Sequence, residues 1–139
     1  MRLVLIESPY AGDVAYNLAY GRACVADCLA RGEAAFASHL LYTQEGVLDD
    51  SDPAERKLGM RAGFAFGSKC DATVVYIDLG QSPGMLAGVR DAQMNGRPIE
   101  YRRLGRLPVR AGLPGCCSEC GRRLMPTPAP RCIRCPPPM

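Results

Sequence analysis

Strand-like and helix-like patterns of apolar residues alternate through the first hundred positions of the chain. Short apolar runs predict four β-strands, and apolar residues spaced three or four apart predict three helices. The expected strands are residues 2–7, 33–38, 72–77 and 98–102, and the expected helices are residues 14–31, 52–66 and 82–94. Residues 39–50 show neither pattern and are expected to form a loop.

This order of elements predicts the fold class. Strands that are joined through helices form parallel sheets with right-handed crossovers and with helices on both faces. We expect a small three-layer α/β domain with a flavodoxin-like or Rossmann-like sheet in the strand order 2-1-3-4. Because the connections leave the first strand in opposite directions, we expect a ligand crevice beyond the carboxyl ends of the first and third strands.

The second helix begins with a recognisable capping sequence. Asp52 is expected to cap this helix, with Glu55 as the partner that a capping box needs. The buried face of the helix is expected to carry Leu58, Ala62 and Ala65, which follow helical spacing.

Charge and composition divide the chain into a body and a tail. Residues 1–100 hold 9 basic and 13 acidic residues, a net charge of −4, whereas residues 101–139 hold 8 arginines and one acidic residue, a net charge of +7. The latter segment also holds 8 of the 12 prolines and 5 of the 8 cysteines. We expect an α/β domain over residues 1–103, a linker over residues 104–113 and a distinct tail over residues 114–139.

The chain carries no sign of a membrane span or an export signal. No apolar run approaches the roughly 18–20 residues that a span requires. The apolar run at residues 3–6 is too short for the core of a signal peptide. We therefore expect a cytoplasmic protein without membrane contact.

Polar residues gather in the three loops that the predicted topology brings to the crevice. These loops are residues 7–13, 39–44 and 78–85, and they carry carboxylates, hydroxyls, amides and the single histidine of the chain. Carboxylates bind ribose hydroxyls, and the free amides of a helix that starts at Ser82-Pro83 bind a phosphate. This combination predicts a site for a nucleoside or a nucleotide.

Structural roles for the same residues stay open. Asp78 also suits the cap of a turn, Ser82-Pro83 also suits a simple helix start, and His39 also suits a packing position at a strand end. Cys24 and Cys28 lie one helical turn apart and are expected to be small core residues. The chain has neither a GxGxxG nor a P-loop pattern, which argues against a standard dinucleotide or nucleoside-triphosphate site.

The body carries a series of short motifs: Glu7-Ser8-Pro9-Tyr10-Ala11-Gly12, Asn17, Cys70-Asp71-Ala72, Asp78 and Ser82-Pro83-Gly84-Met85. In this order and spacing they resemble the nucleoside 2-deoxyribosyltransferase-like superfamily, in particular its small phage and bacterial members of unknown function. The resemblance covers residues 2–102. It implies that the loop after the first strand and the loop before the third helix enclose a nucleoside or a nucleotide. With the loop residues above, the candidate ligand-binding residues are Ser8, Pro9, Tyr10, Gly12, Asn17, His39, Tyr42, Asp78, Ser82, Gly84 and Met85.

The resemblance also implies a mechanism from which this chain departs. In the family, a glutamate four residues after the glycine of the last motif attacks the anomeric carbon and forms a covalent sugar–enzyme intermediate. If Gly84 is that glycine, the glutamate position is occupied by Gly88. The remaining candidates for a catalytic carboxylate are Asp78, Asp13 and Glu7, and the sequence does not select one of them.

We therefore expect a nucleoside- or nucleotide-binding protein of the deoxyribosyltransferase-like fold that lacks the usual glutamate nucleophile. The alternative is an enzyme that hydrolyses or exchanges the N-glycosidic bond with another carboxylate. The residues alone do not decide whether the protein is an enzyme. The resemblance further implies a homo-oligomer in which a neighbouring chain completes the site.

The tail carries two Cys-x-x-Cys pairs, Cys117/Cys120 and Cys132/Cys135, separated by eleven residues. Two such pairs close a tetrahedral Zn²⁺ site, so we expect these four cysteines to bind a structural zinc in a ribbon-like or knuckle-like unit. Cys116 is a spare thiol that can compete for the metal. The alternative is a tail with free thiols or disulfides, and a cytoplasmic location disfavours disulfides.

Arginines flank the predicted zinc site and leave nucleic-acid contact through phosphates open. The segment has no aromatic residue beyond Tyr101 to stack on bases, so nucleic-acid binding is not favoured. A third hypothesis is an adaptor or nucleic-acid-associated protein whose zinc tail makes the main contact.

Overall fold

The computed structural model describes residues 1–109 of the chain, and the predicted cysteine tail lies outside the described residues. The elements follow the predicted order with one additional short helix. The strands are β1 (Arg2–Glu7), β2 (Glu33–Phe36), β3 (Ala72–Tyr76) and β4 (Ile99–Arg102), and the helices are α1 (Val14–Ala30), α2 (Ser38–Leu41), α3 (Pro53–Gly67) and α4 (Pro83–Met94). Among residues 1–109, no helix combines the length and the apolar character that crossing a membrane requires.

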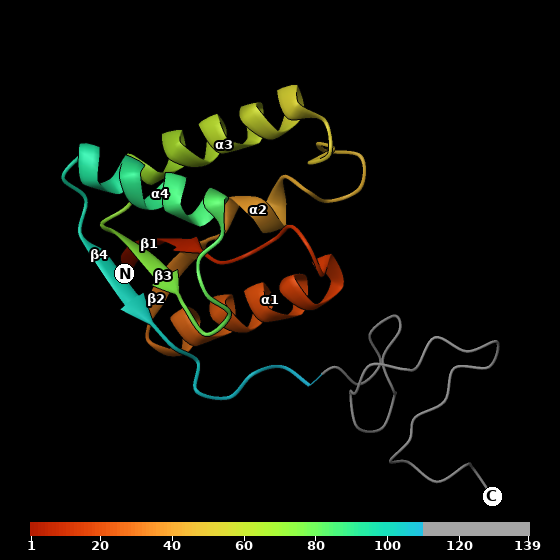
Figure 1. Ribbon diagram of the computed structural model, residues 1–139. Coiled ribbons are helices and arrows are strands. Elements are labelled where there is room, and N and C mark those ends of the chain that lie inside the picture. Colours follow the sequence, from red (N-terminus) through yellow and green to blue (C-terminus); the bar gives the residue numbers. More distant parts are fainter. Residues whose placement is uncertain (110–139) are drawn as a thin grey trace, which may run out of the picture.

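The four strands are parallel and lie in the order β2-β1-β3-β4, which confirms the predicted 2-1-3-4 sheet. Helix α1 covers one face of this sheet, and α3 and α4 cover the other (Figure 1). The chain leaves β1 toward β2 on one side, and β3 pairs with β1 on the other. The carboxyl ends of β1 and β3 are therefore neighbours at the point where the direction of winding changes.

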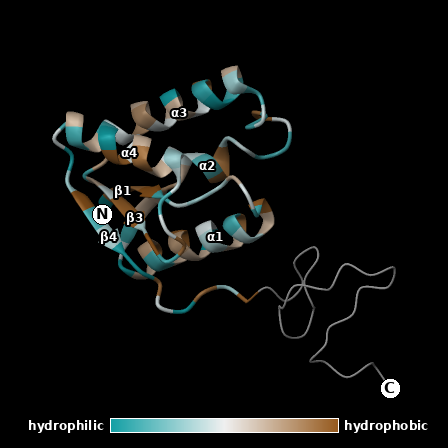
Figure 2. Cartoon of the chain, viewed as in Figure 1, coloured by the Kyte–Doolittle hydropathy of each residue, from teal (hydrophilic) through white to brown (hydrophobic). Residues whose placement is uncertain are grey.

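The main hydrophobic core lies between the sheet and α1. Val4 and Val74 from the central strands pack with Tyr20, Cys24 and Cys28 from the helix, and all five side chains are fully buried. In Figure 2, apolar residues colour the central strands, and the helices around them carry both polar and apolar residues. The two cysteines thus occupy core positions, as their spacing predicts.

Helix α2 replaces the start of the predicted loop because a leucine anchors it to the core. Leu40 packs against the core cluster beside Gly21 of α1. A Cβ at position 21 would lie 2.9 Å from Leu40 Cδ2, so the glycine makes room for the leucine. The contact joins segments that are distant in sequence, and no local pattern indicates it.

Helix α3 begins as predicted but buries a different face. The Asp52 carboxylate accepts hydrogen bonds from the amides of Ala54 and Glu55, whereas the Glu55 carboxylate accepts one from Asp49 and does not complete a capping box. The predicted buried face is wrong, because Leu58 is 53% exposed and Ala65 is exposed.

Glycines form the buried face of α3 instead. Gly63 and Gly67 are buried, and a Cβ at position 63 would lie 2.7 Å from the Oγ of Ser38. A Cβ at position 67 would lie 2.9 Å from a Leu5 methyl group. Because these positions lack side chains, α3 can approach α2 and β1 closely. Other residues of the helix then lie near the end of β1.

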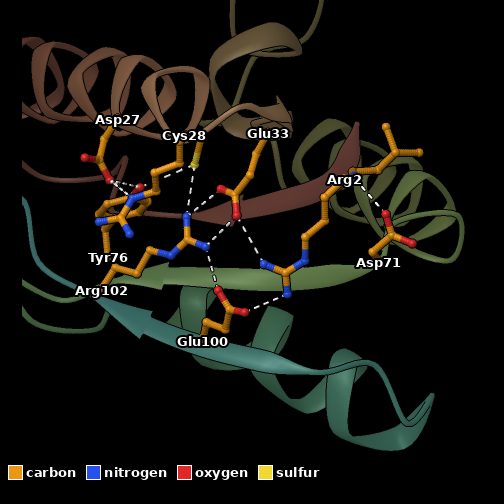
Figure 3. A network of polar contacts seen from close by, with 10 residues as sticks. Arg2, Asp27, Cys28, Glu33, Asp71, Tyr76, Glu100 and Arg102 are labelled. Carbon is orange, nitrogen blue, oxygen red and sulfur yellow. Dashed lines mark hydrogen bonds and ion pairs between the residues drawn. The ribbon is translucent and has the colours of Figure 1, made fainter.

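An ion-pair network joins the two edge strands (Figure 3). The guanidinium of Arg102 on β4 contacts Glu33 of β2 at 2.7 Å, and Arg2 of β1 contacts Glu33 at 3.1 Å and Glu100 of β4 at 2.6 Å. The side chains of Arg102 and Glu33 are each only 9% exposed, so the pair is shielded from screening by solvent. The network ties β2 to β4 across the two central strands.

The first residues of the predicted linker lie against the α/β body. Leu104 packs on the main core, and the Tyr16 hydroxyl donates a hydrogen bond to the carbonyl of Pro108 at 3.2 Å. Leu104 and Pro108, at the start of the predicted linker, thus contact the body.

Candidate functional site

A cavity of about 220 Å³ opens at the carboxyl end of β1, where the winding of the sheet changes. It lies at the crevice that the strand order predicts, between the loop after β1, helices α2 and α3, and the start of α4. Six of the candidate ligand-binding residues line it: Ser8, Tyr10, His39, Ser82, Gly84 and Met85. The lining also includes Glu7, Ala11, Asp50, Arg56, Met60, Phe64 and Pro83.

The other candidate residues lie near the cavity without lining it. Asn17 holds the loop after β1, because its side-chain amide donates hydrogen bonds to the carbonyls of Tyr10 at 3.0 Å and Ala11 at 2.9 Å. Gly12 makes the turn in that loop with a φ of 97°, and Asp13 caps α1. These residues shape the loop that carries the lining side chains, and Pro9 is buried within it.

Tyr42 lines a second, smaller cavity of about 60 Å³ that adjoins the first. The two cavities share His39, Asp50, Arg56 and Met60. The two cavities are therefore neighbours along α2 and the start of α3.

Asp78 lies outside both cavities and makes local contacts. Its carboxylate accepts hydrogen bonds from the Tyr20 hydroxyl at 2.6 Å and from the amides of Leu104 at 3.0 Å and Gly105 at 3.4 Å. Burial opposes ionisation, but these hydrogen bonds keep the pKa of Asp78 below its usual value. In this structure Asp78 fastens the segment after β4 to the end of β3.

Ser8 and His39 form a close pair on the cavity lining. The Oγ of Ser8 and the Nε2 of His39 are 2.6 Å apart. Burial lowers the pKa of His39 to about 4, because the charged imidazolium would lose its hydration. The imidazole is therefore neutral at pH 7 and acts as a polar group that can donate or accept a hydrogen bond.

The start of α4 and Arg56 together present hydrogen-bond donors to the cavity. Ser82 caps α4 by accepting a hydrogen bond from the Met85 amide at 3.3 Å, and the Gly84 amide lies in the first turn, where amides have no helical acceptor. Arg56 is paired with Asp50 at 3.0 Å, and its second guanidinium nitrogen would lie 3.6 Å from a Cβ at position 84. A helix N-terminus beside a guanidinium favours an anion.

Sequence reasoning missed the contribution of α3 to this site. Arg56, Met60 and Phe64 are spaced four residues apart, so they form one stripe along the helix. This spacing was visible in the sequence, but a stripe that mixes a charge with apolar residues does not indicate burial. The close approach through the glycines places the stripe on the cavity.

Glu7 is the one carboxyl group of β1 that reaches the cavity. Burial raises its pKa to about 8, Arg97 opposes this shift and Asp91 adds to it. Within residues 1–109, the side chain of Glu7 makes no hydrogen bond or ion pair, and no fully buried side-chain oxygen or nitrogen lacks a hydrogen-bond partner. Glu7 thus lines the cavity with a carboxyl group that has no side-chain partner among the described residues.

The described residues contain no group of three or more His, Cys, Asp or Glu side chains placed to hold a metal ion. The predicted zinc ligands Cys117, Cys120, Cys132 and Cys135 lie outside that part of the chain, and zinc binding stays a prediction.

Comparisons with known proteins agree with this fold. A model of the family described as "Domain of unknown function (DUF7768)" matches residues 2–102. No curated protein matches the chain. Among solved structures, the chain is similar to a 2-deoxyribosyltransferase from the psychrotolerant bacterium Bacillus psychrosaccharolyticus, described as a biocatalyst for nucleoside synthesis, with a TM-score of 0.54 and 15% identity over 73% of this chain and 72% of that one. This similarity shows that the chain has a deoxyribosyltransferase-like α/β fold.

Proposed function

The chain belongs to the DUF7768 family, a family of domains of unknown function, and we propose that it binds a nucleoside or a nucleotide in the cavity at the end of β1. The observation that carries this proposal is the composition and position of the cavity. Its position at the switch point of the sheet is where open α/β folds bind ligands. The fold that it shares with a 2-deoxyribosyltransferase supports the same ligand class.

The apolar part of the cavity suits a planar base. Met60 and Phe64 come from α3, and Met85 comes from α4. An aromatic ring and polarizable thioethers pack well against a flat heterocycle. A few polar groups among apolar ones is the usual composition of a site that orients a small molecule.

The polar part of the cavity suits a sugar and a phosphate. The neutral Ser8–His39 pair and the carboxyl of Glu7 can exchange hydrogen bonds with sugar hydroxyls. The Gly84 amide and the Arg56 guanidinium would bind the phosphate of a nucleotide. We expect a nucleoside 5′-monophosphate to bind more tightly than its nucleoside.

Ligand binding can be tested by thermal shift and calorimetry with the four 2′-deoxynucleosides and their 5′-monophosphates. At least one compound should raise the unfolding midpoint, because a ligand that binds only the folded state stabilises it. Phe64→Ala should weaken binding of both classes. Arg56→Gln should weaken monophosphate binding by about tenfold or more and nucleoside binding little.

Arg61→Gln is the matched control, because Arg61 lies exposed on the same helix. It should leave both affinities unchanged. The proposal is wrong if no compound shifts the midpoint at millimolar concentration. If Arg56→Gln weakens nucleoside and monophosphate binding equally, the proposed contact between Arg56 and the phosphate is wrong. The cavity would still be the proposed binding site.

A second candidate function is hydrolysis or exchange at the N-glycosidic bond. It is favoured by Glu7, a carboxyl group that faces the cavity without a protein partner among the described residues. The hypothesis of a zinc-tailed adaptor concerns residues outside the described part of the chain and stays a prediction of the sequence.

A further inference from the structure

Glu7 of β1 and Gly88 of α4 are in direct contact. A Cβ added at position 88 would lie 2.0 Å from Oε1, 2.3 Å from Cδ and 2.9 Å from Oε2 of Glu7. The carboxyl group thus occupies the space that any side chain at position 88 would need. The resemblance implies a glutamate at position 88. This chain has a glycine there, and the carboxyl group of Glu7 from β1 lies beside it.

The charges nearest to Glu7 are already paired with each other. Arg97 forms an ion pair with Asp91 at 2.6 Å, and the two side chains are 5% and 17% exposed. Arg97 also donates a hydrogen bond to Thr73 at 2.9 Å. Arg97 lowers the pKa of Glu7 and Asp91 raises it, and the effect of burial outweighs that of Arg97.

The other elements around the cavity bring no free charge to Glu7. His39 of α2 is neutral at pH 7, since burial lowers its pKa to about 4. Arg56 of α3 is paired with Asp50. Enclosure without a charged partner raises the pKa of Glu7 to about 8, so the group carries its proton at neutral pH.

From this geometry we propose that Glu7 is the proton donor for cleavage of an N-glycosidic bond in the cavity. The inference rests on the proposed nucleoside or nucleotide site and assigns its reactive group. Gly88 is the residue that makes the arrangement fit, because any larger residue would displace the carboxyl group. The same carboxyl group also suits the second half of the reaction.

The Glu7 carboxylic acid gives its proton to a ring nitrogen of the base while the C1′–N bond breaks and both bonding electrons leave with the base. A water molecule then adds to C1′ of the sugar and returns a proton to the Glu7 carboxylate. One nucleoside and one water are consumed, and one free base and one free sugar are formed. A single carboxyl group that acts first as acid and then as base restores itself in each cycle.

The experiment compares the full-length wild type with Glu7→Gln for release of free base from the eight compounds named above, measured by chromatography. The amide keeps the shape and hydrogen-bonding capacity of the protonated acid but cannot transfer its proton. We expect base release to fall by about 100-fold or more in the variant. Affinity measured by calorimetry should change by less than about threefold, because the loss concerns the transition state.

The pH dependence gives a second readout. The wild-type rate should decline above about pH 8, where Glu7 loses its proton, and residual activity of Glu7→Gln should lack this decline. Glu45→Gln makes the same chemical change at an exposed glutamate and should retain the wild-type rate. Glu7→Ala/Gly88→Glu moves the carboxyl group onto α4 and should release base faster than Glu7→Ala alone.

The proposal is overturned if Glu7→Gln releases base at the wild-type rate, or if the wild type binds a compound but releases no base between pH 5 and 9. If Glu7→Gln does not fold, a wild-type rate that stays constant from pH 6.5 to 9 overturns the proposal. Failure of all eight compounds to bind would contradict the proposed function itself, and this inference with it.

Discussion

Burial shifts the pKa values of two cavity residues, Glu7 and His39, in opposite directions. The pKa of Glu7 rises to about 8 and that of His39 falls to about 4, because an enclosed site favours the neutral form of each group. Both are therefore neutral at pH 7, and Arg56 and Asp50 are the charged residues that line the same space. The neutral polar groups suit the base and hydroxyls of a nucleoside, and Arg56 is the cationic group of the lining that suits a phosphate.

These shifts predict how stability depends on pH. From about pH 4 to 6.5 the unfolded chain binds more protons at His39, so this residue makes stability rise with pH. From about pH 4.5 to 8 the folded protein keeps the Glu7 proton that the unfolded chain has lost, so Glu7 makes the free energy of unfolding fall as pH rises. Above pH 6.5, of these two residues only Glu7 still makes stability depend on pH.

The free energy of unfolding from urea titrations should therefore fall by up to about 2 kcal/mol between pH 6.5 and 8 through Glu7, at about 1.4 kcal/mol per pH unit. Glu7→Gln should lose this decline, and Glu45→Gln should keep it. The same decline in Glu7→Gln as in the wild type would show that the Glu7 carboxyl is not enclosed in this way.

At the scale of elements, hydrogen bonds to Asp78 fasten one segment to another. The residue stands two positions after the end of β3, and it connects that strand to α1 through Tyr20 and to the segment after β4 through Leu104 and Gly105. The strand end predicted as a ligand-binding position thus serves in this structure to hold the chain that leaves the sheet. Among the strands, β1 brings a carboxyl group, that of Glu7, to the cavity.

Asp78→Ala should lower the free energy of unfolding by about 2–4 kcal/mol, because it leaves the Tyr20 hydroxyl and two amides without their charged acceptor. Nucleotide affinity should change by less than about threefold in conditions where the variant is folded. Urea denaturation and calorimetry measure the two effects, and Glu45→Ala, at an exposed glutamate, serves as the control. If Asp78→Ala weakens nucleotide binding and leaves the free energy of unfolding unchanged, Asp78 is a ligand-binding residue and not a structural one.

At the scale of the whole molecule, the chain is described through residue 109, and the start of the predicted linker contacts the α/β body at Leu104 and Pro108. The cysteine tail beyond it is known from its sequence. Its two Cys-x-x-Cys pairs predict one structural zinc per chain. Such a site would add a metal-dependent unit to the chain, whose residues 1–109 contain no group of three or more His, Cys, Asp or Glu side chains placed to hold a metal ion.

Metal analysis of the purified full-length protein should therefore find about one equivalent of zinc. Cys117→Ser/Cys132→Ser should reduce it to less than about half an equivalent, because each pair loses a thiolate ligand. Cys116→Ser is the matched control and should retain the metal. Less than half an equivalent in the wild type with reduced, intact cysteines would contradict the four-cysteine site.

The sequence by itself determined the order of strands and helices, the 2-1-3-4 sheet and the place of the crevice. Apolar periodicity and the caps at Asp52 and Ser82 are local signals, and right-handed crossovers convert their order into a topology. The residues of the loop after β1 and of the α4 start could therefore be placed near one another before any coordinates were known.

Only the tertiary structure decided which side chains meet in the cavity. The stripe of Arg56, Met60 and Phe64 depends on how closely α3 approaches the sheet through its glycines, and that distance is set by distant residues such as Ser38 and Leu5. In the same way, enclosure by several segments sets the protonation of Glu7, and Gly88 leaves the space for its carboxyl group. Close approach and desolvation arise from residues far apart in the chain, so no local pattern encodes them.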